Sequence, residues 1–358
     1  IETGIDRVLD RIVSVATDPG LGDALADLSD GYARTDTPLT DGQLAALEDV
    51  YDDVVRPYDE VDAPRPPIAD LLPESEAGRA VQYQYIAANP DPDQRELLVD
   101  AGDGSPYSEA HARHHEFLRR VAETEGADDL LLVDSRTGEV VYSVDKRVDL
   151  GTDVENGPYQ DSGLGRVVER VSVAAISDAV IVDISFYLPD ASAPLVHVAA
   201  TVRRDAEVIG ALVVSLRTEA LTDVISANGD WELLGLGETG DAYLVGSDGV
   251  LRTKPRAWTD DPDAYIERYL DTGGDARAAE LMAFTDAPIL LHEIDNAAVS
   301  TARGGESFIG VVRNGLDHRS LTAAEPIDLP GLDWMIIAEQ RTSETRSELI
   351  SFLWTTLL

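Results

Sequence analysis

The chain has 358 residues, enough for two or three domains, and its 44% of hydrophobic residues argue for folded cores rather than disorder. Its 68 acidic and 28 basic side chains give a formal net charge of −40, which argues against a nucleic-acid partner because phosphates would be repelled. Cysteine is absent, which excludes disulfides, thiolate metal sites and a cysteine nucleophile.

The acidic residues are spread along the whole sequence, and Lys146 and Lys254 are its two lysines. An acid-rich, lysine-poor surface resembles that of proteins from salt-loving organisms, where dissolved salt screens the self-repulsion. The composition therefore indicates adaptation to a salty solvent more than binding to a charged partner, and we expect a halophilic, archaeal source.

Helical spacing of apolar residues predicts a helix at the start of the chain, from Ile1 through Ile12, and the last ten residues are again apolar-leaning. Ten residues are too few to cross a bilayer, which needs about 20, but they could begin a helix that does. We expect an extracellular segment cut from between two membrane spans. Two ordinary amphipathic helices are the alternative.

The first third of the sequence is predicted to be helical. Residues 1–60 show helical periodicity, with a break at Asp18-Pro19-Gly20 and a second helix over 41–57 that Thr40 or Asp41 caps. After a proline-rich interruption, further helices are predicted over 75–88 and 108–125.

From Asp128 the pattern changes to strands. A hairpin over 128–146 turns at Gly138, and a helical connection near 157–173 follows it. Three strands are predicted next, over 178–187, 194–203 and 208–216, and a helical segment over 217–226 closes the set.

Residues 235–240 spell Gly-x-Gly-x-x-Gly, a pattern that holds a pyrophosphate only between a strand and a helix. Here a second hairpin follows, so we interpret the glycines as a hairpin entry rather than a nucleotide site. A helical connection over 262–284 comes next, followed by strands over 307–313, 319–326 and 333–340 and a helix over 342–358. Two tandem units of one plan indicate a duplication.

Four strings carry a family resemblance: residues 132–146, 149–152, 157–164 and 235–246. They resemble extracellular double Cache sensor domains, which occur in chemotaxis transducers, sensor histidine kinases and some cyclases. The resemblance runs from about residue 80 to 340 and implies an α+β fold: two tandem PAS-like (Cache) units with antiparallel sheets on a long N-terminal stalk helix. It implies a stalk and helical region at 1–79, a membrane-distal unit at 80–216, a membrane-proximal unit at 217–341, and a C-terminal helix at 342–358 that leads into the membrane.

A ligand pocket is expected between the distal sheet and its helical crossover, lined by the inner face of the strands. The candidate ligand-binding residues are Tyr142, Lys146, Tyr159, Ser162, Asp183, Tyr187 and His197. Lys146 could bind a carboxylate or phosphate, or else neutralise nearby aspartates on the surface. Asp183 lies in an apolar strand, where a ligand amine or Lys146 could pair with it, and the tyrosines could instead be core residues.

Amino-acid-binding members of the family carry an Arg-x-Trp-Tyr type string on the crossover. This sequence has Gly157-Pro158-Tyr159 there, which keeps the tyrosine and loses the arginine and tryptophan. The class of ligand therefore stays open.

His111, His114 and His115 have a helical spacing that could hold a transition metal, but no HExxH string accompanies them. No convincing catalytic set is found, and we expect neither an enzyme nor a bound cofactor or metal. The predicted function is small-molecule sensing by a membrane receptor, first a chemotaxis transducer that dimerises through its N-terminal helices. The alternatives are a histidine kinase or cyclase sensor, a secreted metal-dependent hydrolase, and a solute-capture protein without signalling.

Overall fold

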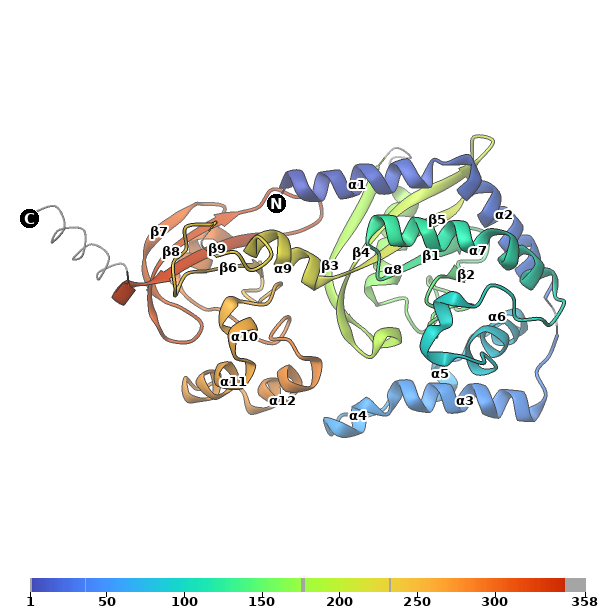
Figure 1. Ribbon diagram of the computed structural model, residues 1–358, viewed down its shortest axis with the longest axis horizontal. Helices are drawn as coiled ribbons and strands as arrows, with labels where there is room; N and C mark the ends of the chain where they lie inside the picture. The colour runs from blue at the N-terminus through green and yellow to red at the C-terminus, as the bar shows by residue number, and fades with distance from the viewer. Residues whose placement is uncertain (1, 36, 175–177, 232, 345–358) are drawn as a thin grey trace, which may run out of the picture. The chain divides into compact units, whose positions relative to one another are not determined.

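A computed structural model describes residues 2–35, 37–174, 178–231 and 233–344. The chain divides into two compact units, each considered by itself: a first unit, Thr3–Arg217, and a second unit that begins at Thr218 and also includes Ile1–Glu2. Each unit contains one antiparallel sheet (Figure 1). The predicted α+β class with two tandem antiparallel units is confirmed.

Helices form the N-terminal third of the first unit. The expected long N-terminal helix is divided at Asp18, whose side chain caps the second helix. The helices are α1 (Glu2–Ala16), α2 (Pro19–Ala33), α3 (Asp41–Val55), α4 (Pro57–Glu60), α5 (Ile68–Leu71), α6 (Glu76–Gln82), the π-helix η1 (Tyr83–Ala87), the 3₁₀-helix η2 (Pro92–Leu97) and α7 (Pro106–Glu125).

Local signals set where these helices begin and end. Thr40 and Gln43 form a capping box at the start of α3, in which the Thr40 main-chain N–H donates to Gln43 Oε1 at 2.9 Å. Ser105 caps α7, and Gly126 ends that helix in the left-handed conformation at φ 65°. The predicted cap at residue 40 and the predicted helix over 108–125 are therefore present.

The sheet of the first unit has the strand order β2-β1-β5-β4-β3. Its strands are β1 (Asp129–Asp134), β2 (Val140–Ser143), β3 (Ala179–Tyr187), β4 (Ala193–Arg204) and β5 (Glu207–Arg217), with α8 (Gly163–Val173) as the crossover and the short 3₁₀-helix η3 (Leu188–Asp190) after β3. Helices α2 and α7 lie against one face of the sheet and α8 against the other. Because both faces are covered, β1 is buried along its whole length.

The sheet of the second unit has the order β6-β9-β8-β7. Its strands are β6 (Asp241–Gly246), β7 (Phe308–Arg313), β8 (Arg319–Pro326) and β9 (Trp334–Arg341), with α9 (Thr218–Ser226), α10 (Arg256–Asp260), α11 (Pro262–Asp271), α12 (Ala276–Thr285) and α13 (Ala297–Arg303) around them. The order matches that of the first unit, except that isolated bridges at Val250 and Leu251 stand where β2 would be. The second hairpin thus keeps its turn but not a full second strand.

The glycines of residues 235–240 have the role predicted for them. Gly235 and Gly237 adopt positive φ angles of 70° and 65°, and β6 rather than a helix follows them. The predicted C-terminal helix begins at residue 342, and its part over 345–358 lies outside the described residues. No helix in the described part of the chain has both the length and the apolar character needed to cross a membrane.

Candidate functional site

One face of the first sheet carries polar residues on adjacent strands. Ser215 on β5 pairs with Asp129 on β1 and with His197 on β4, so these three side chains share the face that α8 covers. On β3, Ser185 and Tyr187 join the same face, because the pairing with β4 shifts by one residue between Val182 and Ser185.

His197 is fully buried on this face. Its ring packs edge-on against Tyr187, with ring centroids 4.9 Å apart, and neither ring nitrogen has a hydrogen-bond partner among the described residues. Burial lowers the pKa of His197 to about 3, so the ring is neutral near pH 7. A neutral imidazole offers a ligand one donor and one acceptor.

Tyr187 connects this face to the loop after β2. Its hydroxyl donates a short hydrogen bond to Asp149 Oδ2, whereas Asp149 Oδ1 is buried without a partner in the described chain. Burial, reinforced by the charge of Asp129, raises the pKa of Asp149 to about 7. Asp149 is therefore a buried acceptor poised for a donor group.

Tyr159 lies just before the crossover helix α8 and is the last residue of this group. Its ring lies 6.3 Å from the ring of Tyr187 and packs in an apolar cluster with residues of α3, while its hydroxyl is buried without a hydrogen-bond partner. Ser162 positions this segment: its hydroxyl donates to Tyr159 O at 2.6 Å and caps α8. A Cβ on Gly163 would lie 2.6 Å from His197 Nδ1, so only glycine lets α8 begin this close to the sheet.

Several of these side chains have a buried polar atom without a hydrogen-bond partner in the described chain, and together we call them the inner-face site. Buried polar atoms normally have partners, and orphans mark a missing water, ion or ligand. The orphaned atoms here are Asp149 Oδ1, Tyr159 Oη, Ser185 Oγ, His197 Nδ1, His197 Nε2 and Ser215 Oγ.

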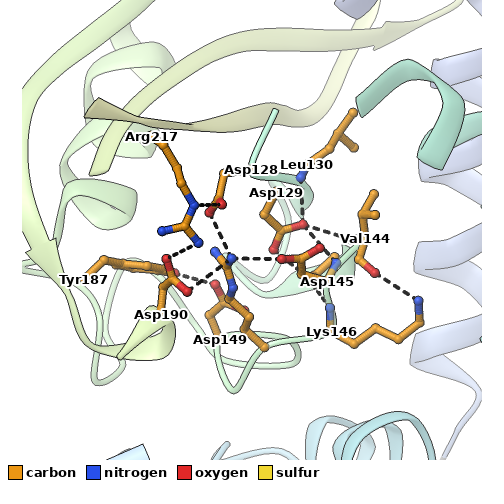
Figure 2. A network of polar contacts seen from close by, with 12 residues as sticks. Asp128, Asp129, Leu130, Val144, Asp145, Lys146, Asp149, Tyr187, Asp190 and Arg217 are labelled. Carbon is orange, nitrogen blue, oxygen red and sulfur yellow. Dashed lines mark hydrogen bonds and ion pairs between the residues drawn. The ribbon is translucent and has the colours of Figure 1, made fainter. Parts of the chain in front are cut away.

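An ion-pair cluster stands at the end of the sheet next to this site (Figure 2). Arg147 Nη2 lies 2.9 Å from Asp128, 2.8 Å from Asp145 and 3.3 Å from Asp190. Arg217 pairs with Asp128 and with Asp190. Burial lowers the pKa of Arg147, but the surrounding aspartates raise it by more, so the guanidinium stays charged. A cleft of about 420 Å³ opens beside this cluster and is lined partly by α3.

Two of the residues predicted to line the pocket lie elsewhere. Tyr142 pairs with Leu132, which puts its ring on the opposite face of the sheet, where its hydroxyl bonds His115 Nδ1 at 2.7 Å. Lys146 is buried at φ 53°, and its amine donates to Val144 O at 3.0 Å. Burial lowers the pKa of Lys146 to about 7, and its charge acts on Asp129 as well as on His111 and His115 of the opposite face.

Asp183 is held at the irregularity of β3, where Ile184 N donates to its Oδ1 at 2.8 Å. In a regular strand, residues 183 and 187 would share a face, and the extra residue of the irregularity breaks that alternation. The structure therefore brings together Tyr159, Tyr187 and His197, with Ser162 behind them, but not Tyr142, Lys146 or Asp183.

Sequence reasoning missed Asp149, Ser185 and Ser215. A lone serine inside the apolar strand around Val213 and Val214 was a usable signal, because a buried hydroxyl needs a partner. Asp149 gave no comparable signal, since its chain neighbours do not show that it is buried.

The three helical histidines bind different partners. His111 Nδ1 contacts Val99 O at 2.8 Å, His114 pairs with Asp27 at 2.9 Å, and His115 contacts both Tyr142 and Glu96 O. Nowhere in the described ranges are three or more His, Asp or Glu side chains arranged to hold a metal ion. The histidine cluster therefore gives no support to a metal-dependent hydrolase.

No family model and no curated protein matches the chain. Among solved structures, the ligand-binding domain of the Pseudomonas fluorescens chemoreceptor CtaA in complex with L-leucine is 15% identical with a TM-score of 0.38, covering 74% of this chain and 84% of that one. The ligand-binding domain of the Pseudomonas aeruginosa PAO1 chemoreceptor PctB in complex with L-Arg is 15% identical with a TM-score of 0.38, covering 66% and 83%. The extracellular domain of the putative histidine kinase rpHK1S-Z16 is 12% identical with a TM-score of 0.39, covering 65% and 78%. All three TM-scores are below 0.5, so these likenesses carry no inference about the ligand of this chain.

Proposed function

We propose that the chain is the extracellular sensing domain of a membrane receptor and that it binds a small polar molecule at the inner-face site. The observation that carries this proposal is the group of buried polar atoms without partners on the strands that α8 covers and on the adjoining residues Asp149 and Tyr159. The double Cache resemblance of residues 132–164 and 235–246 supports the same function, as does the repetition of one strand order in two sheets.

The arrangement suits binding rather than catalysis. Asp149 offers an acceptor, Tyr159 and the two serines offer hydroxyls, and neutral His197 offers both a donor and an acceptor. Such groups orient a hydrogen-bonding molecule, and a ligand that prefers one arrangement of the site would shift the populations of the receptor. A chemotaxis transducer is our first candidate for the whole receptor, with homodimerisation through the N-terminal helices and flanking membrane spans as further parts of the proposal.

The test begins with a thermal-shift screen of the purified chain in molar salt against carboxylates, amino acids, amines, nucleosides and sugars. A compound that binds only the folded state raises the melting temperature. The affinity of the strongest hit is then measured by calorimetry for the wild type and for two matched Tyr→Phe variants.

Tyr159→Phe removes a hydroxyl that lacks a partner in the unliganded protein, so we expect an unchanged or higher melting temperature without ligand and an affinity about tenfold lower. Tyr142→Phe is the control on the opposite face. It loses the bond to His115 and about 1 kcal/mol of stability, but should leave the affinity unchanged. Equal affinities for Tyr159→Phe and the wild type would remove Tyr159 from the site, and a greater loss in Tyr142→Phe would move the site to the other face.

A further inference from the structure

The second unit contains a partly open cavity of about 30 Å³. One side is formed by the strand residues Asp241, Tyr243 and Glu339, and Tyr265 and His292 are among the residues of the other side. A cavity needs roughly 10–15 Å³ to hold one water molecule. This cavity therefore admits an occupant of one or two heavy atoms and excludes an amino acid or a sugar.

The cavity occupies, within its own unit, the position that the inner-face site occupies in the first. Asp129 and Asp241 each begin the first strand of their unit, and each carboxylate accepts main-chain N–H groups, from Val144 in one case and from Arg256 in the other. Ser215 pairs with Asp129, and Glu339 pairs with Asp241. At equivalent positions, the first unit thus has a hydroxyl and the second unit has a carboxyl.

Glu339 is incompletely bonded. Asn314 Nδ2 donates to its Oε1 at 2.7 Å, and the nearby Tyr243 hydroxyl acts on the carboxyl as a hydrogen-bond donor that lowers its pKa, but no hydrogen bond of regular geometry reaches the buried Oε2 from the described residues. The residue is 7% exposed. Burial, with Asp241 nearby, raises the pKa of Glu339 to about 7.

The groups around the cavity supply no cation at Oε2. The guanidinium of Arg256 donates to Gly237 O and Gly240 O, and the more distant Arg341 acts on Glu339 through its charge. His292 bonds the Tyr265 hydroxyl, and burial lowers the pKa of this histidine to about 4, so its ring is neutral near pH 7. The cavity therefore has two carboxyls, an unused acceptor and room for one small donor.

We infer that the second unit holds a ligand site of its own, lined by Asp241, Tyr243 and Glu339, that takes a small hydrogen-bond-donating cation, specifically ammonium. An ammonium ion fits the volume, donates to Glu339 Oε2 and to neighbouring oxygens, and offsets the buried carboxylate charge. The inference does not depend on what the inner-face site binds.

The experiment is calorimetric melting of the whole chain at pH 7.5 in choline chloride that is replaced stepwise by ammonium, potassium or sodium chloride at constant total concentration. Constant ionic strength keeps the general screening of the net charge of −40 the same in every sample. We expect ammonium to raise the melting temperature saturably by roughly 2–6 °C over choline, as a ligand of the folded state does. An equal rise in potassium would overturn the assignment to ammonium, and no difference from choline would overturn the site.

Glu339→Gln keeps the shape of the side chain and should lose the ammonium-specific rise. Glu325→Gln removes the same charge from an exposed position on β8 and should keep it. If Glu339→Gln does not fold, Tyr243→Phe is tested in its place. It should raise several-fold the ammonium concentration that gives half of the maximal rise in melting temperature. The same ammonium response in the cavity variant and in Glu325→Gln would refute the inference.

Discussion

At the scale of single residues, two buried carboxyls of the first unit are bonded differently. Asp129 is satisfied by main-chain N–H groups and by the Ser143 hydroxyl, so it is a structural carboxylate. Asp149, also fully buried, has the Tyr187 hydroxyl on one oxygen and nothing on the other. Burial raises the pKa of both carboxyls, but of the two only Asp149 keeps an oxygen available to a ligand.

Asp149 should make the protein less stable as the pH rises. The folded-state pKa of Asp149 is raised to about 7 from its ordinary value of 3.8, so between these pH values the folded state holds a proton that the unfolded chain has released. Its contribution to stability is complete below about pH 4 and is lost as the pH rises through about 7. Between pH 4 and pH 8, the melting temperature of Asp149→Asn should fall less steeply with rising pH than that of the wild type.

Glu339 and Asp145 have pKa values raised in the same direction, so the slope should shrink in the Asp149 variant without vanishing. Asp49→Asn, at an exposed position on α3, is the matched control for the loss of one acidic side chain. An identical slope in wild type and Asp149→Asn would mean that Asp149 is ionised in the folded state throughout this range.

At the scale of elements, the approach of α8 to the sheet is the feature that shapes the inner-face site. Gly163 at the start of α8 faces His197 Nδ1 and Ser185 Oγ so closely that no side chain fits. Helix α8 therefore begins in close contact with His197 and Ser185 on the polar face of the sheet.

Gly163→Ala should destabilise the protein by about 1–3 kcal/mol, because the added methyl group must push α8 away from His197. Gly42→Ala is the matched control: it lies near the start of α3, and a Cβ there would meet nothing within 4 Å. That substitution should stabilise by about 0.5–1 kcal/mol. Denaturant unfolding measures both changes, and equal effects would show that α8 is not held against the sheet.

Apart from the second strand of the second hairpin, where the structure has only isolated bridges, the strands of both units could be predicted from the sequence to within about two residues, because apolar patterns bounded by glycine turns are strong local signals. The face on which each side chain lies could not. Asp183 was grouped with Tyr187 by regular alternation, and the irregularity after Val182 separates them. The helical signal at 75–88 likewise did not show that the helix becomes a π-helix at Tyr83.

At the scale of the whole molecule, charge is the dominant feature. With 68 acidic and 28 basic side chains, like charges repel one another over much of the surface. The ion pairs of the first unit gather some of this charge around Arg147 and Arg217, but 28 basic side chains cannot pair one-to-one with 68 acidic ones.

The melting temperature should therefore rise steeply with sodium chloride. The screening length falls from about 10 Å at 0.1 M to about 3 Å at 1 M, so most of the rise should occur below about 1 M. Calorimetry across 0.05–3 M measures the curve. A straight rise that continues to the highest concentration would indicate strengthened apolar burial instead, and a flat curve would contradict the charge argument.

The Arg147 cluster also connects the ends of two strands of the first unit. Asp190 follows the end of β3, which carries Tyr187, and it is clamped both to Arg147 and to Arg217. Arg217 is the last residue of β5, and the next residue along the chain opens the second unit. The end of β3 that bonds Asp149 and the end of β5 are thus joined by the same ion pairs, and the chain continues from that end of β5 into the second unit.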